Sequence, residues 1–293
     1  MNGTARSATV SVEVLPDLLQ LIADKDLIWP GESVKFTSRT RMNRTYSVTG
    51  WSWQSGDPGP ALTQFSCTAP TKVCDQVLYE SGSATVSADV LGSVQQASVA
   101  VAVRACSPTG DAVLDDPAVR KGFADMMAAS NPNTPGGHQA AMQAAPNERQ
   151  ERAFWIIRRG STYVVQDQTV RATQCNSDRG AEALQPGDTL VAGGHTHPSR
   201  AGERRYGCKS HPGRQPFSQH PNDNLYAPPA PHRDFNGGGS DTDWGVSDIT
   251  GVPEYVHTKD GNLYRLDPGT PRSQRGGNPN RWRGQGGICF ARR

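Results

Sequence analysis

The stretch TLVAGGHTHP, residues 189–198, carries the most informative pattern in this sequence. Its first four residues are apolar or β-branched and predict a strand that runs directly into Gly193 and Gly194. Alternate residues of a strand point to the same face, so His195 and His197 can reach one ion together. Pro198 ends this strand, and the two glycines permit close approach of another backbone.

The residues around this stretch predict an α+β arrangement for the C-terminal half. An acidic cap and Pro117 begin a helix at 118–129, whose apolar residues recur with helical spacing. Lys259-Asp260-Gly261 is a good hairpin turn. We expect strands at 153–157, 162–166, 255–257 and 262–266. Together they predict a helix packed on a mostly antiparallel sheet.

Residues 15–105 read instead as short strands separated by turn signals. About seven strands, with Trp51 and Trp53 in a middle one, predict an all-β sandwich. The pattern G-E-S-V-K-F-T followed by W-S-W resembles bacterial Ig-like and PKD-like repeats, a likeness of fold that carries no catalytic residue. The two tryptophans are interpreted as core or rim, with a carbohydrate platform as the alternative.

An internal repeat extends this interpretation. Residues 3–14, GTARSATVSVEV, align without gaps on residues 92–103, GSVQQASVAVAV. We expect residues 1–14 to be the last strand of a preceding sandwich, 15–105 the sandwich itself and 111–293 the α+β domain. The alternative is a chance likeness between two strands of simple composition.

Composition excludes several classes of protein. Hydrophobic residues make up 35% of the 293, and the formal net charge is +2, which gives no reason to expect nucleic acid or an anionic membrane as a partner. No apolar run approaches the roughly 20 residues that cross a bilayer, and the N-terminus lacks the pattern of a signal peptide. The internal repeat leads us to expect the C-terminal part of a longer protein that is secreted or on the cell surface, and the resemblance to bacterial Ig-like repeats implies a bacterial one.

The six cysteines, Cys67, Cys74, Cys106, Cys175, Cys208 and Cys289, contain no C-x-x-C pair, which argues against a zinc site of four thiolates. Their number is compatible with disulfides, and Cys67 and Cys74 are near enough to close a small loop. Free thiols in a reducing cytoplasm are the alternative.

A carboxylate can complete the histidine pair. Ser240-Asp241-Thr242-Asp243 begins a predicted helical turn, and Asp243 could supply one ligand, with Asp241 as the alternative. Two imidazoles, one carboxylate and a water form the open tetrahedral site expected of a hydrolytic zinc centre.

These residues resemble the JAB/MPN metallopeptidases, whose signature is a glutamate followed by His-x-His-Pro and Ser-x-x-Asp. Residues 195–198 and 240–243 match it in order and type, and Glu151 stands just before an apolar strand, as the family's glutamate does, with Glu148 nearby. The resemblance covers roughly residues 115–267. It departs from the family in the spacer between the two motifs, residues 199–239, an insertion predicted to be either a lid or disordered.

The resemblance implies a role for each residue. His195, His197 and Asp243 would hold Zn²⁺, Glu151 would act as the general base, and Ser240 would donate a hydrogen bond to the oxyanion. The implied activity is hydrolysis of a peptide or isopeptide bond in a protein or peptide substrate.

The layout is also similar to JAB-like modules at the C-termini of bacterial toxins, which implies an immunity protein as a partner. The alternatives are a binding protein with a degenerate JAB-like domain and an amidase acting on cell-wall peptides.

Overall fold

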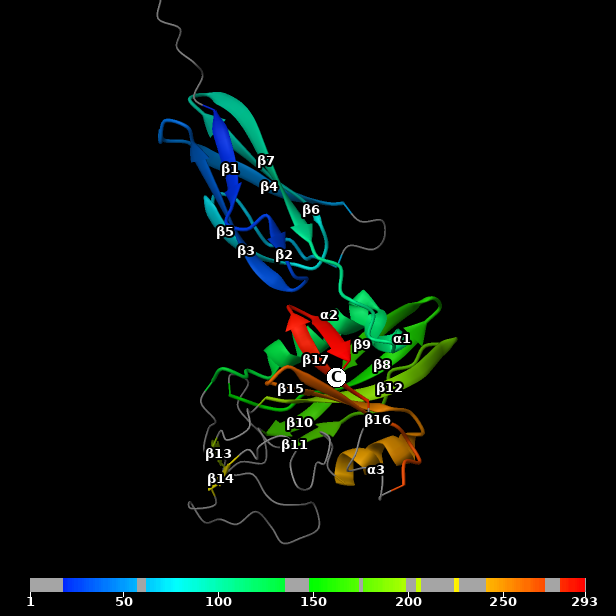
Figure 1. The fold of residues 1–293 in the computed structure, drawn as a ribbon. Helices are drawn as coiled ribbons and strands as arrows, with labels where there is room; N and C mark the ends of the chain where they lie inside the picture. Colours follow the sequence, from blue (N-terminus) through cyan, green and yellow to red (C-terminus); the bar gives the residue numbers. More distant parts are fainter. Residues whose placement is uncertain are drawn as a thin grey trace, which may run out of the picture. The chain divides into compact units, whose positions relative to one another are not determined.

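The computed structural model describes residues 18–56, 62–134, 148–173, 176–198, 204–206, 224–226, 241–271 and 280–292. The chain divides into two units, unit 1 with residues 1–28 and 33–103, and unit 2 with residues 29–32 and 104–293. Most of the described residues that have regular structure are in strands, which form several separate sheets (Figure 1). The repeat at residues 3–14 lies outside the described residues.

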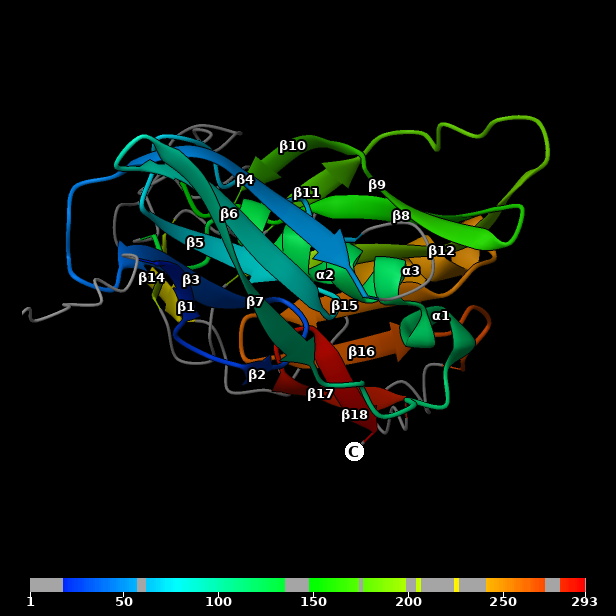
Figure 2. The same ribbon diagram turned by 90° about the horizontal axis from the view of Figure 1, so that it is seen from above.

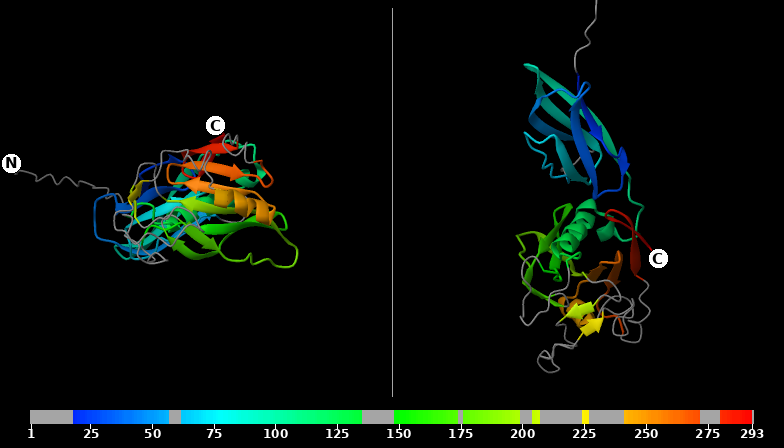
Figure 3. Two further views of the ribbon diagram at one scale, coloured as in Figure 1. Left: turned by 90° about the horizontal axis from the view of Figure 1, so that it is seen from below. Right: turned by 90° about the vertical axis from the view of Figure 1, so that its left-hand side faces the viewer.

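Unit 1 is built from strands in which apolar and polar residues alternate. In β6 (Gly82–Val90) the buried residues are Ala84, Val86, Ala88 and Val90, so one face of the strand points into the core. Two sheets result, visible side by side in Figure 2 and from another direction in Figure 3. The first contains β1 (Leu19–Ala23), β3 (Glu32–Thr40) and β5 (Val73–Leu78), and the second, in spatial order, β2 (Leu27–Ile28), β7 (Ser93–Val103), β6 and β4 (Ser47–Ser55).

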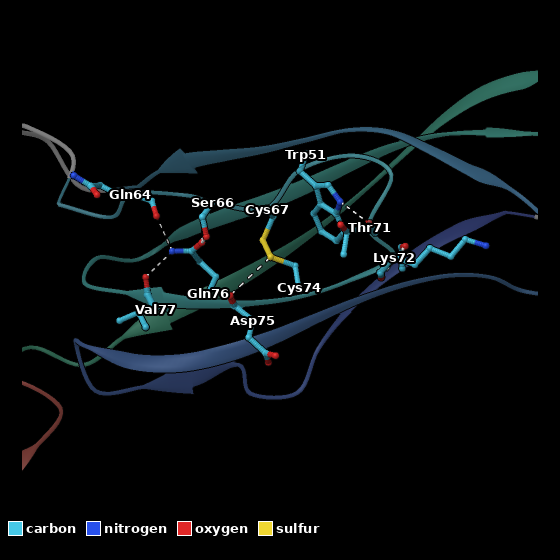
Figure 4. Close-up of a disulfide and its surroundings, with 11 residues drawn as sticks. Trp51, Gln64, Ser66, Cys67, Thr71, Lys72, Cys74, Asp75, Gln76 and Val77 are labelled. Carbon is cyan, nitrogen blue, oxygen red and sulfur yellow. Dashed lines mark hydrogen bonds between the residues drawn. A yellow bond between two sulfur atoms is a disulfide. The ribbon is translucent and has the colours of Figure 1, made fainter. Parts of the chain in front are cut away.

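Both tryptophans lie at the edge of the core of unit 1. Trp51 and Trp53 are partly buried and pack against the apolar cluster, and the Trp53 ring stacks on Phe65 at 5.9 Å between centroids. Trp51 Nε1 donates to the carbonyl of Thr71 at 2.9 Å, beside the disulfide between Cys67 and Cys74 (Figure 4). The structure therefore has the short-loop disulfide that the spacing of these cysteines permits.

Unit 2 is organised around a seven-stranded mixed sheet. Its order is β18-β17-β16-β15-β12-β8-β9, and β12 pairs in parallel with β15 and antiparallel with β8. The other printed pairings within this sheet are antiparallel. The strands are β8 (Ala153–Arg159), β9 (Thr162–Asp167), β12 (Asp188–His197), β15 (Glu254–Thr258), β16 (Asn262–Leu266), β17 (Arg281–Gly286) and β18 (Cys289–Arg292).

Helices cover both faces of this sheet. On one face lie α1 (Ala112–Asp115) and α2 (Pro117–Ala129), with Phe123 of α2 packed edge-on against Phe154 and Tyr255. On the other lies α3 (Asp241–Thr250), whose Trp244 packs with Val256, Tyr264 and Leu266. Figure 1 shows α2 and α3 on opposite sides, and the view from below in Figure 3 shows α3 in gold. The described residues of this unit also form two small antiparallel sheets of two strands: β10 (Thr169–Thr173) with β11 (Asn176–Arg179), and β13 (Arg204–Tyr206) with β14 (Asn224–Tyr226).

The helix and the four strands predicted for this half are present. Asp116 caps α2 by accepting from the backbone amides of Ala118 and Val119, and Pro117 follows it, as the sequence indicates. The sequence did not reveal α1, β10, β11, β17 or β18. These are short or glycine-rich segments, and β17 and β18 are held by pairing with neighbours in the sheet and by burial of Trp282 and Phe290 in the core.

A second disulfide, Cys106–Cys289, joins the start of unit 2 to β18 across 183 residues of sequence. In the chain-entropy model, closing a loop of this length stabilises the fold by on the order of 5 kcal/mol. Cys175 and Cys208 lie outside the described residues. Among the described residues, no helix is both long and apolar enough to span a bilayer.

Gly122 lies where α2 packs on the sheet, and substitution of this glycine tests how close that packing is. Gly245 of α3 has open space around it and serves as the comparison. A methyl group at Gly122 would lie 2.6 Å from Val165 Cβ, whereas one at Gly245 of α3 would meet nothing within 4 Å. We expect Gly122→Ala to lower the free energy of unfolding by about 1–2 kcal/mol, because overpacking outweighs the gain in helix propensity. Gly245→Ala should raise it by about 0.5–1 kcal/mol. Chemical denaturation measures both, and equal effects at the two positions would contradict this packing.

Candidate metal centre

Strand β12 places both histidines on the face of the sheet that carries α3. Ala192 packs in the core beneath α2, and the Thr196 hydroxyl bonds to Ser130 at the C-terminus of α2. The alternate residues Gly193, His195 and His197 therefore point to the opposite face. The strand ends at His197, immediately before Pro198, as the sequence predicts.

Helix α3 brings Asp243 to the two imidazoles. His195 Nε2 lies 3.2 Å from His197 Nε2 and 3.5 Å from Asp243 Oδ1, and the three potential ligand atoms lie within 4.8 Å of one another. A tetrahedron with metal–ligand bonds of about 2.0–2.2 Å has edges of about 3.3–3.6 Å. The two separations from His195 Nε2 are close to these edges, so these residues could hold a metal ion.

Glu151 lies on the same side of the sheet as the two histidines. Ala153 is opposite His195 in the β8–β12 register, and Thr196 N donates to Arg152 O at 2.9 Å, so the pairing continues beyond the start of β8. Glu151, two residues before Ala153, therefore shares the face of His195. It is 5% exposed, and its carboxylate is near enough to help raise the pKa of His195.

The residues on either side of Glu151 are anchored. Gln150 N donates to Ser130 O at 3.0 Å, and Arg152 N donates to Thr196 Oγ1 at 2.9 Å. Thr196, the residue between the two histidines, thus ties this segment to β12. The backbone positions of Glu151 and of the histidine pair are set by the same hydrogen bonds.

Behind His195 lies an ion pair that the sequence did not reveal. Glu254, the first residue of β15, approaches His195 Nδ1 with Oε1 at 2.8 Å, and Arg179 donates to both oxygens of this carboxylate. Arg179 Nη2 also donates to Gly194 O at 2.9 Å. Glu254 could have been noticed only as a charged residue at the start of an apolar strand, and Arg179 stands in a polar stretch without a pattern.

The two glycines before His195 make room for side chains. A methyl group at Gly194 would collide with the Phe154 ring on the α2 face, and one at Gly193 would collide with Arg179 and Glu254 on the other face. The two glycines alone predict a close approach of another backbone at this point. The close approach is by side chains instead, because both faces of β12 are covered at this point.

Charges around His195 favour a cation at this position. Burial by itself lowers the pKa of the imidazole, but the carboxylates of Asp243, Glu254 and Glu151 more than offset it and raise the pKa to about 9. Burial raises the pKa of Glu254, whereas Arg179 and His195 bring it below its ordinary value. Without a metal ion, the His195 imidazole therefore holds a proton and carries the positive charge.

Several predicted residues lie outside the described part of the chain. Ser240 and Cys208 are among them, as is most of the insertion at 199–239, apart from the backbone of β13 and β14. The predicted helical turn is present as α3, beginning at Asp241. The structure brings together four of the five predicted site residues, His195, His197, Asp243 and Glu151. Comparison with models of known protein families finds no match to this chain, and a search of curated proteins finds none either.

The burial of His257, on the α2 face, can be tested by the pH dependence of the free energy of unfolding. Its ring lies between Phe123 and Phe290, and burial lowers its pKa to about 4, which the hydrogen bond to the Phe123 carbonyl opposes only in part. Because the folded pKa is below the unfolded value of about 6.5, the folded state binds fewer protons, so stability is present above pH 6.5 and is lost as pH falls towards 4. We expect the metal-free protein to lose on the order of 3 kcal/mol over this range.

The raised pKa of His195 has the opposite sign, so its contribution is complete below pH 6.5 and declines only as pH rises towards 9. It therefore leaves the acid window unchanged. Denaturation of wild type and His257→Leu between pH 7 and 4.5 measures the difference. A variant with the same pH dependence as wild type would show that His257 is not the group responsible.

Proposed function

We propose that unit 2 is a zinc-dependent hydrolase of peptide or isopeptide bonds, similar to the JAB/MPN metallopeptidases. The observation that carries the proposal is the convergence of His195, His197 and Asp243, because Asp243 reaches the histidine pair across the whole insertion. The order of the motifs matches the family signature, and Glu151 lies on the same face of the sheet.

The donor set suits zinc. Two imidazole nitrogens and one carboxylate oxygen are the protein ligands of many catalytic zinc sites, and they leave a fourth position open. When bound, zinc would supply Lewis-acid chemistry, activating water as a nucleophile and polarising the scissile carbonyl. His195 is 6% exposed, which keeps its ligand nitrogen in a region where electrostatic interactions are strong.

Glu151 fits the role of general acid and base. Its carboxylate would accept the proton of the attacking water and deliver it to the nitrogen of the leaving group, so that the C–N bond breaks with release of a neutral amine and not of an amide anion. The anchored residues on both sides hold it in place for both transfers. Ser240 keeps its predicted role as donor to the oxyanion.

The features of unit 1 support an extracellular setting. Its seven described strands in two sheets suit an Ig-like or PKD-like module that displays an enzyme. Disulfides such as Cys67–Cys74 in unit 1 and Cys106–Cys289 in unit 2 persist mainly in oxidising compartments. We infer a secreted or surface-displayed bacterial protein, with unit 2 as a toxin-like effector whose partner would be an immunity protein.

Metal analysis tests the first part of the proposal. We expect purified protein to contain about one zinc ion per chain, and His195→Ala or Asp243→Ala to contain almost none, because two remaining ligands bind zinc weakly. His257→Leu, on the opposite face of the sheet, is the control and should keep its zinc. The proposal fails if no zinc co-purifies and added zinc changes neither the melting temperature nor hydrolysis.

Substitution of Glu151 tests the mechanism separately from the metal. Glu151→Gln should retain zinc but lose about 10²–10⁴-fold in kcat, because the amide cannot accept the proton. Glu148→Gln, three residues upstream, is the matched control and should stay near wild type. Full activity in Glu151→Gln would remove this residue from the mechanism.

Substrates for these assays should span the candidate classes: ubiquitin-like chains, unfolded protein and muropeptides. Cleavage of muropeptides alone would identify a cell-wall amidase. Zinc binding without hydrolysis of any of the three would favour a binding protein that has lost catalysis.

A further inference from the structure

The buried ion pair behind His195 takes no part in the reaction outlined above, yet it touches the metal centre directly. Glu254 Oε1 is 2.8 Å from His195 Nδ1, on the side of the ring opposite the ligand nitrogen. The side chains of His195, Glu254 and Arg179 are 8%, 2% and 10% exposed, so water has little access to this contact. A charged pair in such a place costs free energy of desolvation, which calls for a compensating role.

A carboxylate at Nδ1 decides which nitrogen of the ring carries hydrogen. An ionised Glu254 only accepts hydrogen bonds, so His195 must present Nδ1–H to it, and the lone pair of a neutral ring is then on Nε2. Nε2 is the atom that faces His197 and Asp243. Glu254 thus selects the tautomer that can bind a metal ion.

Arg179 holds Glu254 and the backbone of β12 at once. Its guanidinium donates to both oxygens of the carboxylate and to Gly194 O, the carbonyl that precedes His195, and it lies over the Trp155 ring at 4.4 Å. A bidentate pair fixes the carboxylate in angle as well as in distance. The residue comes from β11, so the pair of strands β10 and β11 takes part in shaping the centre.

Gly193 has no side chain, and the Arg179–Glu254 pair occupies the space that a side chain would fill. A methyl group there would collide with Arg179 Nη1 and Glu254 Oε2, the two atoms that form one arm of the bidentate contact. The sequence Gly193-Gly194-His195 therefore combines the ligand with the room that its support requires.

We propose that Arg179 and Glu254 are positioning residues that set the metal affinity of the centre by fixing the tautomer and orientation of His195, with Gly193 providing their space. This inference rests on the proposed function only in requiring that the wild-type centre binds a metal ion. It assigns no ligand and no proton transfer to either residue. Outer carboxylates of this kind are typically worth 10–100-fold in metal affinity.

Zinc affinity of the full chain, measured by competition with a chelator, tests the proposal. We expect Glu254→Gln and Gly193→Ala to weaken zinc binding 10–100-fold, although neither removes a ligand and Gly193→Ala changes no charge. Arg179→Lys keeps the charge but loses the bidentate contact and should also weaken binding. The matched control is Asp188→Asn, which breaks the Arg159–Asp188 pair between β8 and β12 at the far end of the strands.

A second measurement separates positioning from general loss of structure. In zinc-loaded wild type, ¹⁵N NMR of the imidazoles should show His195 with hydrogen on Nδ1, and the cobalt-substituted protein should show the absorption of a tetrahedral site. Glu254→Gln should change both signals. If this variant does not fold, Arg179→Lys and Gly193→Ala decide the matter by the same measurements.

The outcomes distinguish the two proposals. Wild type that binds zinc, with variants at positions 254, 193 and 179 that bind it equally well, would overturn the positioning role and leave the hydrolase proposal intact. An Asp188→Asn variant that weakens binding as much as they do would overturn it too. Wild type that binds no zinc would overturn the proposed function itself.

Discussion

Unit 2 depends on the pairing of β12 with β8 on one side and β15 on the other. This pairing places His195 opposite Ala153 and Val256. It sets the start of β8 against the end of β12, and Glu254 at the start of β15 against Gly193. Because side chains alternate across a strand, the residues at these ends fall on defined faces. Glu151, His195 and Glu254 come from three separate parts of the sequence, and they meet because two ladders share one central strand.

The same arrangement concentrates charge where water has little access. Three carboxylates act on His195, and one guanidinium is placed against Glu254, the carboxylate at Nδ1 of the imidazole. A buried carboxylate is costly without a partner, so the Arg179–Glu254 pair and a cation at Nε2 each lower the free energy of the site. The two glycines of β12 follow from this crowding, since one face holds the Phe154 ring and the other the ion pair.

The two disulfides close loops of very different length. Cys67–Cys74 closes a short loop beside Trp51 in unit 1, while Cys106–Cys289 closes nearly the whole of unit 2. The second bond holds β18, an edge strand of the main sheet, to the segment that enters the unit. Much of what keeps the outer strands in place is thus covalent or supplied by strand pairing, which explains why their own sequence indicated little.

The sequence by itself determined what local pattern can determine. Alternation predicted the strands of unit 1, capping by Asp116 predicted the start of α2, and i, i+2 spacing put His195 and His197 on one face. Only the tertiary structure decided that Asp243 returns to the histidines, that Glu254 and Arg179 stand behind them, and that Cys106 joins Cys289. The reason is physical: these contacts join residues far apart in the chain, and their closeness is set by sheet order and helix packing, which local periodicity does not encode.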